Sequence, residues 1–178
     1  PLDVVVAGLA VVDIIGKPID LKHPPKKGGL RQIEDIVLTT GGNVSNVGID
    51  LSKLGFRVGA VTRVGKDRLA QVLMQEYANH GVDVSGVTVD RDAQTSATMI
   101  SVDRSGERTF LHTRGCMANF RVSDILSQLK LIRNAKFLVF GYLGLVPEME
   151  RELPRLFRTV KERTGAKILV DTGGLPHR

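Results

Sequence analysis

Residues 39–55 read TTGGNVSNVGIDLSKLG, and this stretch decides how the chain is expected to fold. Gly41 and Gly42 separate a strand-like run from a run with the apolar spacing of a helix. Glycines at such a junction let the backbone approach a ligand closely, and the N-terminus of the helix offers unpaired N–H groups to oxygen atoms. Asn46, one turn into the helix, can both donate hydrogen bonds to hydroxyl groups and accept them. The stretch therefore predicts a ligand site between a strand and a helix, although a tight turn followed by an exposed Asn explains the same spacing.

Alternating strand and helix patterns surround this junction. The apolar run VVVAGLAVV is typical of a central strand buried on both faces of a parallel sheet. Asp67 is a good N-cap for a helix that Gly81 ends. We expect strands at 4–12, 57–65, 135–141 and 166–171, and helices at 43–54, 67–80, 122–131 and 148–164. This order predicts an α/β fold with a mostly parallel sheet that is sandwiched by helices.

Two segments interrupt the strand–helix rhythm. Residues 95–113 alternate in polarity about the turn Asp103–Gly106, which is a β-hairpin signature. Residues 17–35 hold three prolines and a glycine pair, so we expect short strands around 27–29 rather than a helix, with a further strand at 36–40. The segments at approximately 14–40 and 95–113 are therefore predicted to form a small second sheet.

Composition limits the class of protein. The 178 residues carry a net charge of +6, but the Lys and Arg residues are scattered without interleaved aromatics, so we do not expect nucleic-acid binding. No apolar run approaches the length of a membrane span, and Asp3 lies where a signal peptide needs basic residues. The single cysteine, Cys116, suits a reducing compartment. We therefore expect one domain, located in the cytoplasm, with neither nucleic acid nor membrane as a partner.

The motifs taken together resemble one known family. GG-x-x-x-N at residues 41–46, a helix that ends in LG, and VG-x-D at 64–67 resemble the N-terminal signature of the ribokinase-like (PfkB) carbohydrate kinases. Asp13 lies where that family keeps an Asp that binds sugar hydroxyls. SGERTF at 105–110 resembles the turn of the family's β-sheet lid, and Ala-Asn at 118–119 resembles the pair that follows it.

The resemblance implies a ribokinase-like fold in which the small sheet is a lid and residues 1–178 are the N-terminal part of one kinase domain. In that family a later Gly-Ala-Gly-Asp segment supplies the catalytic base and an anion hole, and residues 1–178 contain no such segment. We therefore expect this sequence to be a fragment without a catalytic residue, able at most to bind sugar weakly on its own.

The resemblance also implies specific binding residues, and each has a plainer alternative. In the plainer alternative, Asp13 merely caps a turn and Arg108 is merely an exposed residue of the hairpin. Asp171 then merely starts the turn Asp-Thr-Gly-Gly. The implied sugar-binding residues are Asp13, Gly41, Gly42 and Asn46, with Arg108 and Asn119 as weaker candidates and Asp171 as a candidate near the nucleotide phosphates. His23 and His112 are expected to be surface or packing residues, because no Cys or carboxylate is spaced to form a metal site with either.

The function implied is an ATP-dependent carbohydrate kinase that transfers a γ-phosphoryl group to a sugar hydroxyl. It would use ATP and Mg²⁺, and a monovalent cation such as K⁺ remains an option. A homodimer through the lid is also implied, and its face is predicted to contain Ile100, Val102, Phe110 and His112. The alternative is a non-catalytic sugar- or nucleotide-binding module, a pseudo-kinase. A dinucleotide-dependent oxidoreductase is disfavoured because the third glycine of its fingerprint is missing.

Overall fold

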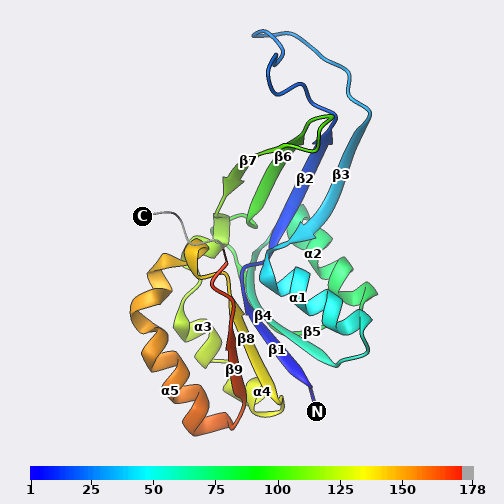
Figure 1. The fold of residues 1–178 in the computed structure, drawn as a ribbon. Helices are drawn as coiled ribbons and strands as arrows, with labels where there is room; N and C mark the ends of the chain where they lie inside the picture. The colour runs from blue at the N-terminus through cyan, green and yellow to red at the C-terminus, as the bar shows by residue number, and fades with distance from the viewer. Residues whose placement is uncertain (174–178) are drawn as a thin grey trace.

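The computed structural model describes residues 1–173, and these residues form two β-sheets (Figure 1). The main sheet is parallel throughout and has the strand order β5-β4-β1-β8-β9. Its strands are β1 (Val4–Gly8), β4 (Val58–Gly65), β5 (Asp83–Asp90), β8 (Phe137–Gly141) and β9 (Lys167–Val170). The predicted parallel sheet is therefore confirmed, with β1 at its centre.

Helices cover both faces of the main sheet. Along β1, Val4 and Val6 pack into one apolar cluster and Val5 and Ala7 pack into the other, as the alternation of side chains in a strand requires. The first cluster lies under α1 (Gly42–Lys53) and α2 (Arg68–Asn79), and the second lies under α3 (Val122–Leu126), α4 (Leu129–Arg133) and α5 (Leu153–Thr164). Short 3₁₀ turns connect these elements: η1 (Gly115–Asn119), η2 (Leu143–Leu145) and η3 (Pro147–Glu152). None of the helices described is long and apolar enough to span a bilayer.

The second sheet, called the small sheet below, projects from the main body (Figure 1). Its strand order is β3-β2-β6-β7, with β2 (Val11–Lys17), β3 (Asp35–Gly41), β6 (Ala97–Val102) and β7 (Arg108–Thr113). β2 pairs with β6 in parallel, and the two outer pairs are antiparallel. The predicted hairpin at 95–113 and the predicted strand at 36–40 are both part of it.

The structure corrects the expectation of one central strand at 4–12. The run divides at Leu9 and Ala10, so that β1 belongs to the main sheet and β2 to the small sheet. Gly8 makes the change of direction possible: it has φ +138°, and a Cβ atom there would overlap the carbonyl oxygen of Gly141. The apolar pattern could not reveal this break because residues on both sides of it are buried.

Three further expectations were wrong or incomplete. Residues 18–34 contain no strand, and the prolines among them cannot donate to a sheet. The expected turn is present, with the Gly29 N–H donating to the Lys26 carbonyl (2.7 Å). The predicted helix at 122–131 is divided into α3 and α4. Strand β5 was missed because Gly86 and its polar residues obscure the strand pattern.

Asp67 joins helix α2 to the start of the β6–β7 hairpin. Its Oδ1 accepts from the Ala70 N–H (2.8 Å), which confirms the predicted N-cap, and also from the Thr95 hydroxyl (2.7 Å). Its Oδ2 accepts from the Thr95 N–H (2.7 Å). Although partial burial opposes it, this hydrogen bonding holds the pKa of Asp67 below its ordinary value. One carboxylate therefore fixes both a helix and the chain that leads into the small sheet.

Replacing Asp67 should separate these two roles. Asp67→Ala removes the cap and the Thr95 anchor, so we expect the free energy of unfolding to fall by about 3 kcal/mol. Asp67→Ser retains a capping oxygen but cannot hold Thr95 at two points, so about 1 kcal/mol of that loss should be recovered. Urea denaturation of both variants measures the effects, and equal losses would show that capping contributes nothing.

Candidate functional site

The candidate site lies where the small sheet joins the main sheet, beyond the carboxyl ends of β1 and β8 (Figure 1). Asp13 on β2 faces Gly41 at the end of β3, since a Cβ atom on Gly41 would overlap the Asp13 carboxylate. Gly42 begins α1, and Asn46, one turn later, donates from Nδ2 to Tyr142 Oη (3.4 Å) after β8. The structure thus gathers the four principal predicted residues around the N-terminus of α1.

Asn43 fixes this arrangement and was not singled out from the sequence. The side chain is fully buried; its Nδ2 donates to the Ala7 carbonyl (2.9 Å) and its Oδ1 accepts from the Leu9 N–H (2.8 Å). These two backbone groups lie on either side of Gly8, where β1 passes into β2. The only signal in the sequence was the position of this Asn directly after the glycine pair. Asn43 therefore sets the direction in which β2 carries Asp13.

A row of polar residues crosses the small sheet at the level of Asp13. Asp13 pairs with Thr39 on β3 and Thr98 on β6, and Thr98 pairs with His112 on β7. We call Thr39, Asp13, Thr98 and His112 the polar row. Because residues paired in register point to one face of a sheet, these side chains lie on the same side. Neither Thr98 nor His112 was predicted to belong to the site, since the pairing of distant strands cannot be read from local sequence.

Electrostatics suit Asp13 to binding hydroxyl groups. Burial raises the pKa of the Asp13 carboxyl, and the Thr98 hydroxyl and His112 partly offset that rise. A half-buried carboxylate has lost part of its hydration and gains from any hydroxyl that donates to it. The N-terminus of α1 adds partial positive charge next to it.

The weaker candidates lie elsewhere. Arg108 is exposed at the start of β7, about 13 Å along the strand from His112. Asp171 follows β9, and its Oδ1 accepts from the Gly173 N–H (2.8 Å). It therefore starts a turn, as the plainer alternative for this residue predicted. A role for either residue in ligand binding stays a prediction.

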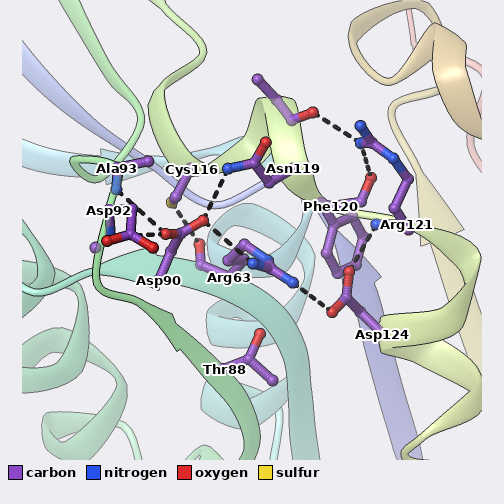
Figure 2. Close-up of polar contacts among 12 residues, drawn as sticks. Arg63, Thr88, Asp90, Asp92, Ala93, Cys116, Asn119, Phe120, Arg121 and Asp124 are labelled. Carbon is purple, nitrogen blue, oxygen red and sulfur yellow. Dashed lines mark hydrogen bonds and ion pairs between the residues drawn. The ribbon is translucent and has the colours of Figure 1, made fainter.

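Asn119 takes part in a different network, drawn in Figure 2. Its Nδ2 donates to Asp90 Oδ2 (2.9 Å), and Arg63 bridges Asp90 (3.1 Å) and Asp124 (2.7 Å). The Asn119 amide and the Asp92 N–H hold the pKa of Asp90 at about 2. The network links β4, β5, η1 and α3 to one another. Asn119 is thus engaged in a structural contact, and sugar binding by it remains only a prediction.

The donor set for a nucleotide is incomplete in this part of the chain. Within residues 1–173, no group of three or more His, Cys, Asp and Glu side chains could hold a metal ion. Mg²⁺ in kinases is commonly held by one or two carboxylates and the substrate phosphates, so Asp171 alone is compatible with an indirect contact through water.

Comparison with known proteins places the chain among sugar kinases. The model of a family described as pfkB family carbohydrate kinase matches residues 2–175. A probable fructokinase-3 of Arabidopsis thaliana is 30% identical over 131 residues, which cover 74% of this chain and 38% of that protein. Fructokinase-2 of Solanum habrochaites is 29% identical over 131 residues, which cover 74% of this chain and 40% of that protein. The chain thus spans less than half the length of these relatives.

Solved structures agree on the fold. Ribokinase from Giardia lamblia has a TM-score of 0.82 at 19% identity, covering 100% of this chain and 56% of its own. Arabidopsis thaliana ribokinase complexed with ribose and ATP has a TM-score of 0.77 at 19% identity, covering 98% of this chain and 54% of its own. The predicted ribokinase-like fold, a mostly parallel sheet between helices with an added small sheet, is confirmed. Since the family model covers nearly all of the described residues, the chain belongs to the pfkB family of carbohydrate kinases.

Proposed function

We propose that this chain is the sugar-binding part of an ATP-dependent kinase that transfers the γ-phosphoryl group of ATP to a sugar hydroxyl. The observation that carries the proposal is the half-buried Asp13 carboxylate, which faces Gly41 at the N-terminus of α1 in a chain of the pfkB family. The first substrate we propose is D-fructose, because the relatives at 28–30% identity are named fructokinases. D-Ribose is the second, from the ribokinases of similar fold.

Each residue of the site has a proposed task in binding. Asp13 accepts hydrogen bonds from two sugar hydroxyls, and the glycine backbone lets the sugar approach the N-terminus of α1. Asn46 orients a further hydroxyl, and the small sheet excludes water from above. ATP with Mg²⁺ supplies the phosphoryl group and neutralises its charge. We propose that the catalytic base lies in a Gly-Ala-Gly-Asp segment outside residues 1–178. Dependence on K⁺ and a cytoplasmic location stay predictions.

The assay is ADP release from ATP and Mg²⁺ over a panel of sugars, with D-fructose and D-ribose first, using the full-length protein that contains residues 1–178. Binding of the same sugars is measured in parallel by calorimetry. Turnover would establish a kinase and name its substrate. Sugar binding without turnover would favour the non-catalytic module. The absence of both binding and turnover would refute the proposal.

We also propose that two copies associate through the small sheet. The sequence placed the contact on the face with Ile100 and Phe110, but Ile100 is only 9% exposed. The opposite face carries a register row of Leu38, Ile14, Met99 and Leu111, in which Leu38, Met99 and Leu111 are 50–69% exposed. An apolar row of this kind calls for a partner surface, and a second copy supplies one.

Neighbouring substitutions on β7 distinguish the two faces. Leu111→Glu places a charge in the exposed apolar row and should convert a dimer to a monomer in light-scattering measurements. Phe110→Glu points to the opposite face and should leave the dimer intact. The reverse result would restore the face predicted from the sequence, and two dimeric variants would exclude the small sheet as the interface.

A further inference from the structure

Arg114 and Glu148 form an ion pair between the small sheet and the main body. Arg114 follows β7 directly, and Glu148 lies on η3, in the segment after β8. The two Nη atoms of the guanidinium donate to the two carboxylate oxygens of Glu148 at 2.8 and 2.6 Å. A bidentate arginine–carboxylate pair is stronger and more fixed in geometry than a single contact. The pair therefore holds the guanidinium in one orientation.

The guanidinium has no edge left for an anionic ligand. An arginine can hold an anion with two parallel donors on either of two edges, one formed by the two Nη atoms and one that includes Nε. Glu148 occupies the first edge. The second edge is inaccessible because the Nε atom is buried, without a hydrogen-bond partner within residues 1–173. A ligand would have to displace Glu148 in order to bind Arg114 at two points.

The ion pair borders the candidate sugar site. Burial lowers the pKa of His112, Asp13 raises it, and Arg114 lowers it further. The guanidinium therefore lies within electrostatic reach of the polar row. On the side of the main body, the segment that carries η3 begins at Tyr142, whose hydroxyl accepts a hydrogen bond from α1 at 3.4 Å. Both partners of the ion pair thus come from segments that adjoin the site.

Glu148 changes the charge that a ligand meets at this border. Arg114 alone would place a positive charge near the half-buried Asp13, and a carboxylate or phosphate group on a sugar would be attracted to it. Glu148 cancels that charge, and hydrogen bonding to Arg114 holds the pKa of Glu148 at about 2, so the cancellation persists at neutral pH. With the pair intact, the Asp13 carboxylate repels an anionic sugar but accepts the hydroxyl groups of a neutral one.

We propose that Glu148 is a positioning residue that determines specificity: it withholds Arg114 from ligands, so that the site selects a neutral sugar over a sugar acid or a sugar phosphate. This inference rests on the proposed sugar-binding function. Glu148 acts through Arg114 and not through a contact of its own with the sugar.

The test compares D-fructose with two matched acids by calorimetry, using the full-length protein that contains residues 1–178. In 2-keto-D-gluconate and in D-fructuronate, a carboxylate replaces the hydroxymethyl group of D-fructose at C1 and at C6, respectively. If D-ribose is the sugar that binds, its C5 acid D-riburonate replaces both. Because Asp13 opposes a like charge, the wild type should bind each acid at least about thirtyfold more weakly than the neutral sugar.

Glu148→Gln should relax this selection. The variant keeps the shape of the side chain but removes its charge, so Arg114 becomes available to a carboxylate on the ligand. The affinity for the better acid, divided by the affinity for the neutral sugar, should rise about thirtyfold relative to the wild type. A ratio is used because a purely structural effect of the substitution would weaken both ligands alike and leave the ratio unchanged.

Two controls assign the change to Arg114. Glu150→Gln removes the same charge from an exposed residue of the same turn, η3, and should leave the ratio within about threefold of that of the wild type. The double variant Arg114→Gln with Glu148→Gln lacks the cation as well as the carboxylate. In that variant the gain in affinity for the acid should disappear.

The outcomes separate this inference from the proposed function. If Glu148→Gln weakens the acids and the neutral sugar in equal proportion, the ion pair only ties the small sheet to the main body; the inference is then wrong and the sugar site stands. It is also wrong if the double variant keeps the gain, or if the wild type binds an acid as tightly as the neutral sugar. If the wild type binds no sugar of the panel, the proposed function fails and the inference falls with it. The measurement on the wild type does not depend on the folding of any variant.

Discussion

On the proposed function, Asp13→Asn should lower kcat/KM for the sugar by a factor of about one hundred to one thousand. Each hydrogen bond from a sugar hydroxyl to the carboxylate contributes about 1.5–2 kcal/mol, and the amide replaces one acceptor oxygen with a donor. Steady-state kinetics with the best sugar of the panel measures the loss. Asp35→Asn is the matched control, because Asp35 is on β3 of the same sheet but forms an exposed ion pair with Lys17 (3.8 Å).

Stability provides an independent check on this variant. Burial raises the pKa of Asp13, so the folded protein binds that proton more tightly than the unfolded chain does. The ionised carboxylate therefore lowers stability at neutral pH, and stability should increase as the pH falls through the raised pKa. Asp13→Asn should accordingly be at least as stable as the wild type. A variant that loses both activity and stability would point to a structural role, and one with normal kinetics would place the sugar elsewhere.

Gly8→Ala should destabilise the fold by about 4 kcal/mol. The backbone at Gly8 has φ +138°, a conformation that L-residues rarely adopt. An added Cβ would also overlap the Gly141 carbonyl and lie 2.5 Å from Asn43 Oδ1, which would disturb the hydrogen bonds of Asn43 to Ala7 and Leu9. Both effects act where β1 passes into β2, so the main sheet and the small sheet are affected together.

Gly81→Ala is the control for backbone strain alone. Gly81 also has a positive φ, +64°, but a Cβ there would meet nothing within 4 Å. We expect Gly81→Ala to lower the free energy of unfolding by about 1 kcal/mol. Urea denaturation of the two variants gives the comparison, and equal losses would mean that the close packing between Gly8 and Asn43 does not contribute.

Local signals in the sequence predicted those parts of the fold that local signals determine. The bounds of α1 and α2 followed from glycines and from the Asp67 cap, because helix ends depend on neighbouring residues. The break at Leu9 was missed because a buried run does not indicate which sheet its halves join. Strand β5 was missed because Gly86 weakens its pattern, although the parallel sheet around it was predicted correctly.

The candidate site divides in the same way. Asp13 and the glycine pair were named through motifs, and the structure brings them together. Asn43, Thr98 and His112 were not named, because their importance depends on which strands pair and in which register. Side chains from β2, β6 and β7 form one row only after distant parts of the chain have paired, and a single sequence contains no measure of that pairing.

The parallel pairing of β2 with β6 also has a consequence for synthesis of the protein on the ribosome. Val12 pairs with Ala97, about 85 residues later in the chain, and contacts so distant in sequence form late. β2 follows β1 directly and leaves the ribosome early, while its neighbour β6 is still unmade. Strand β3 can pair with one edge of β2 early, but the other edge, at Ile14 and Ile15, must remain without β6 through much of translation. The nascent chain therefore carries an open strand edge that chaperones can bind.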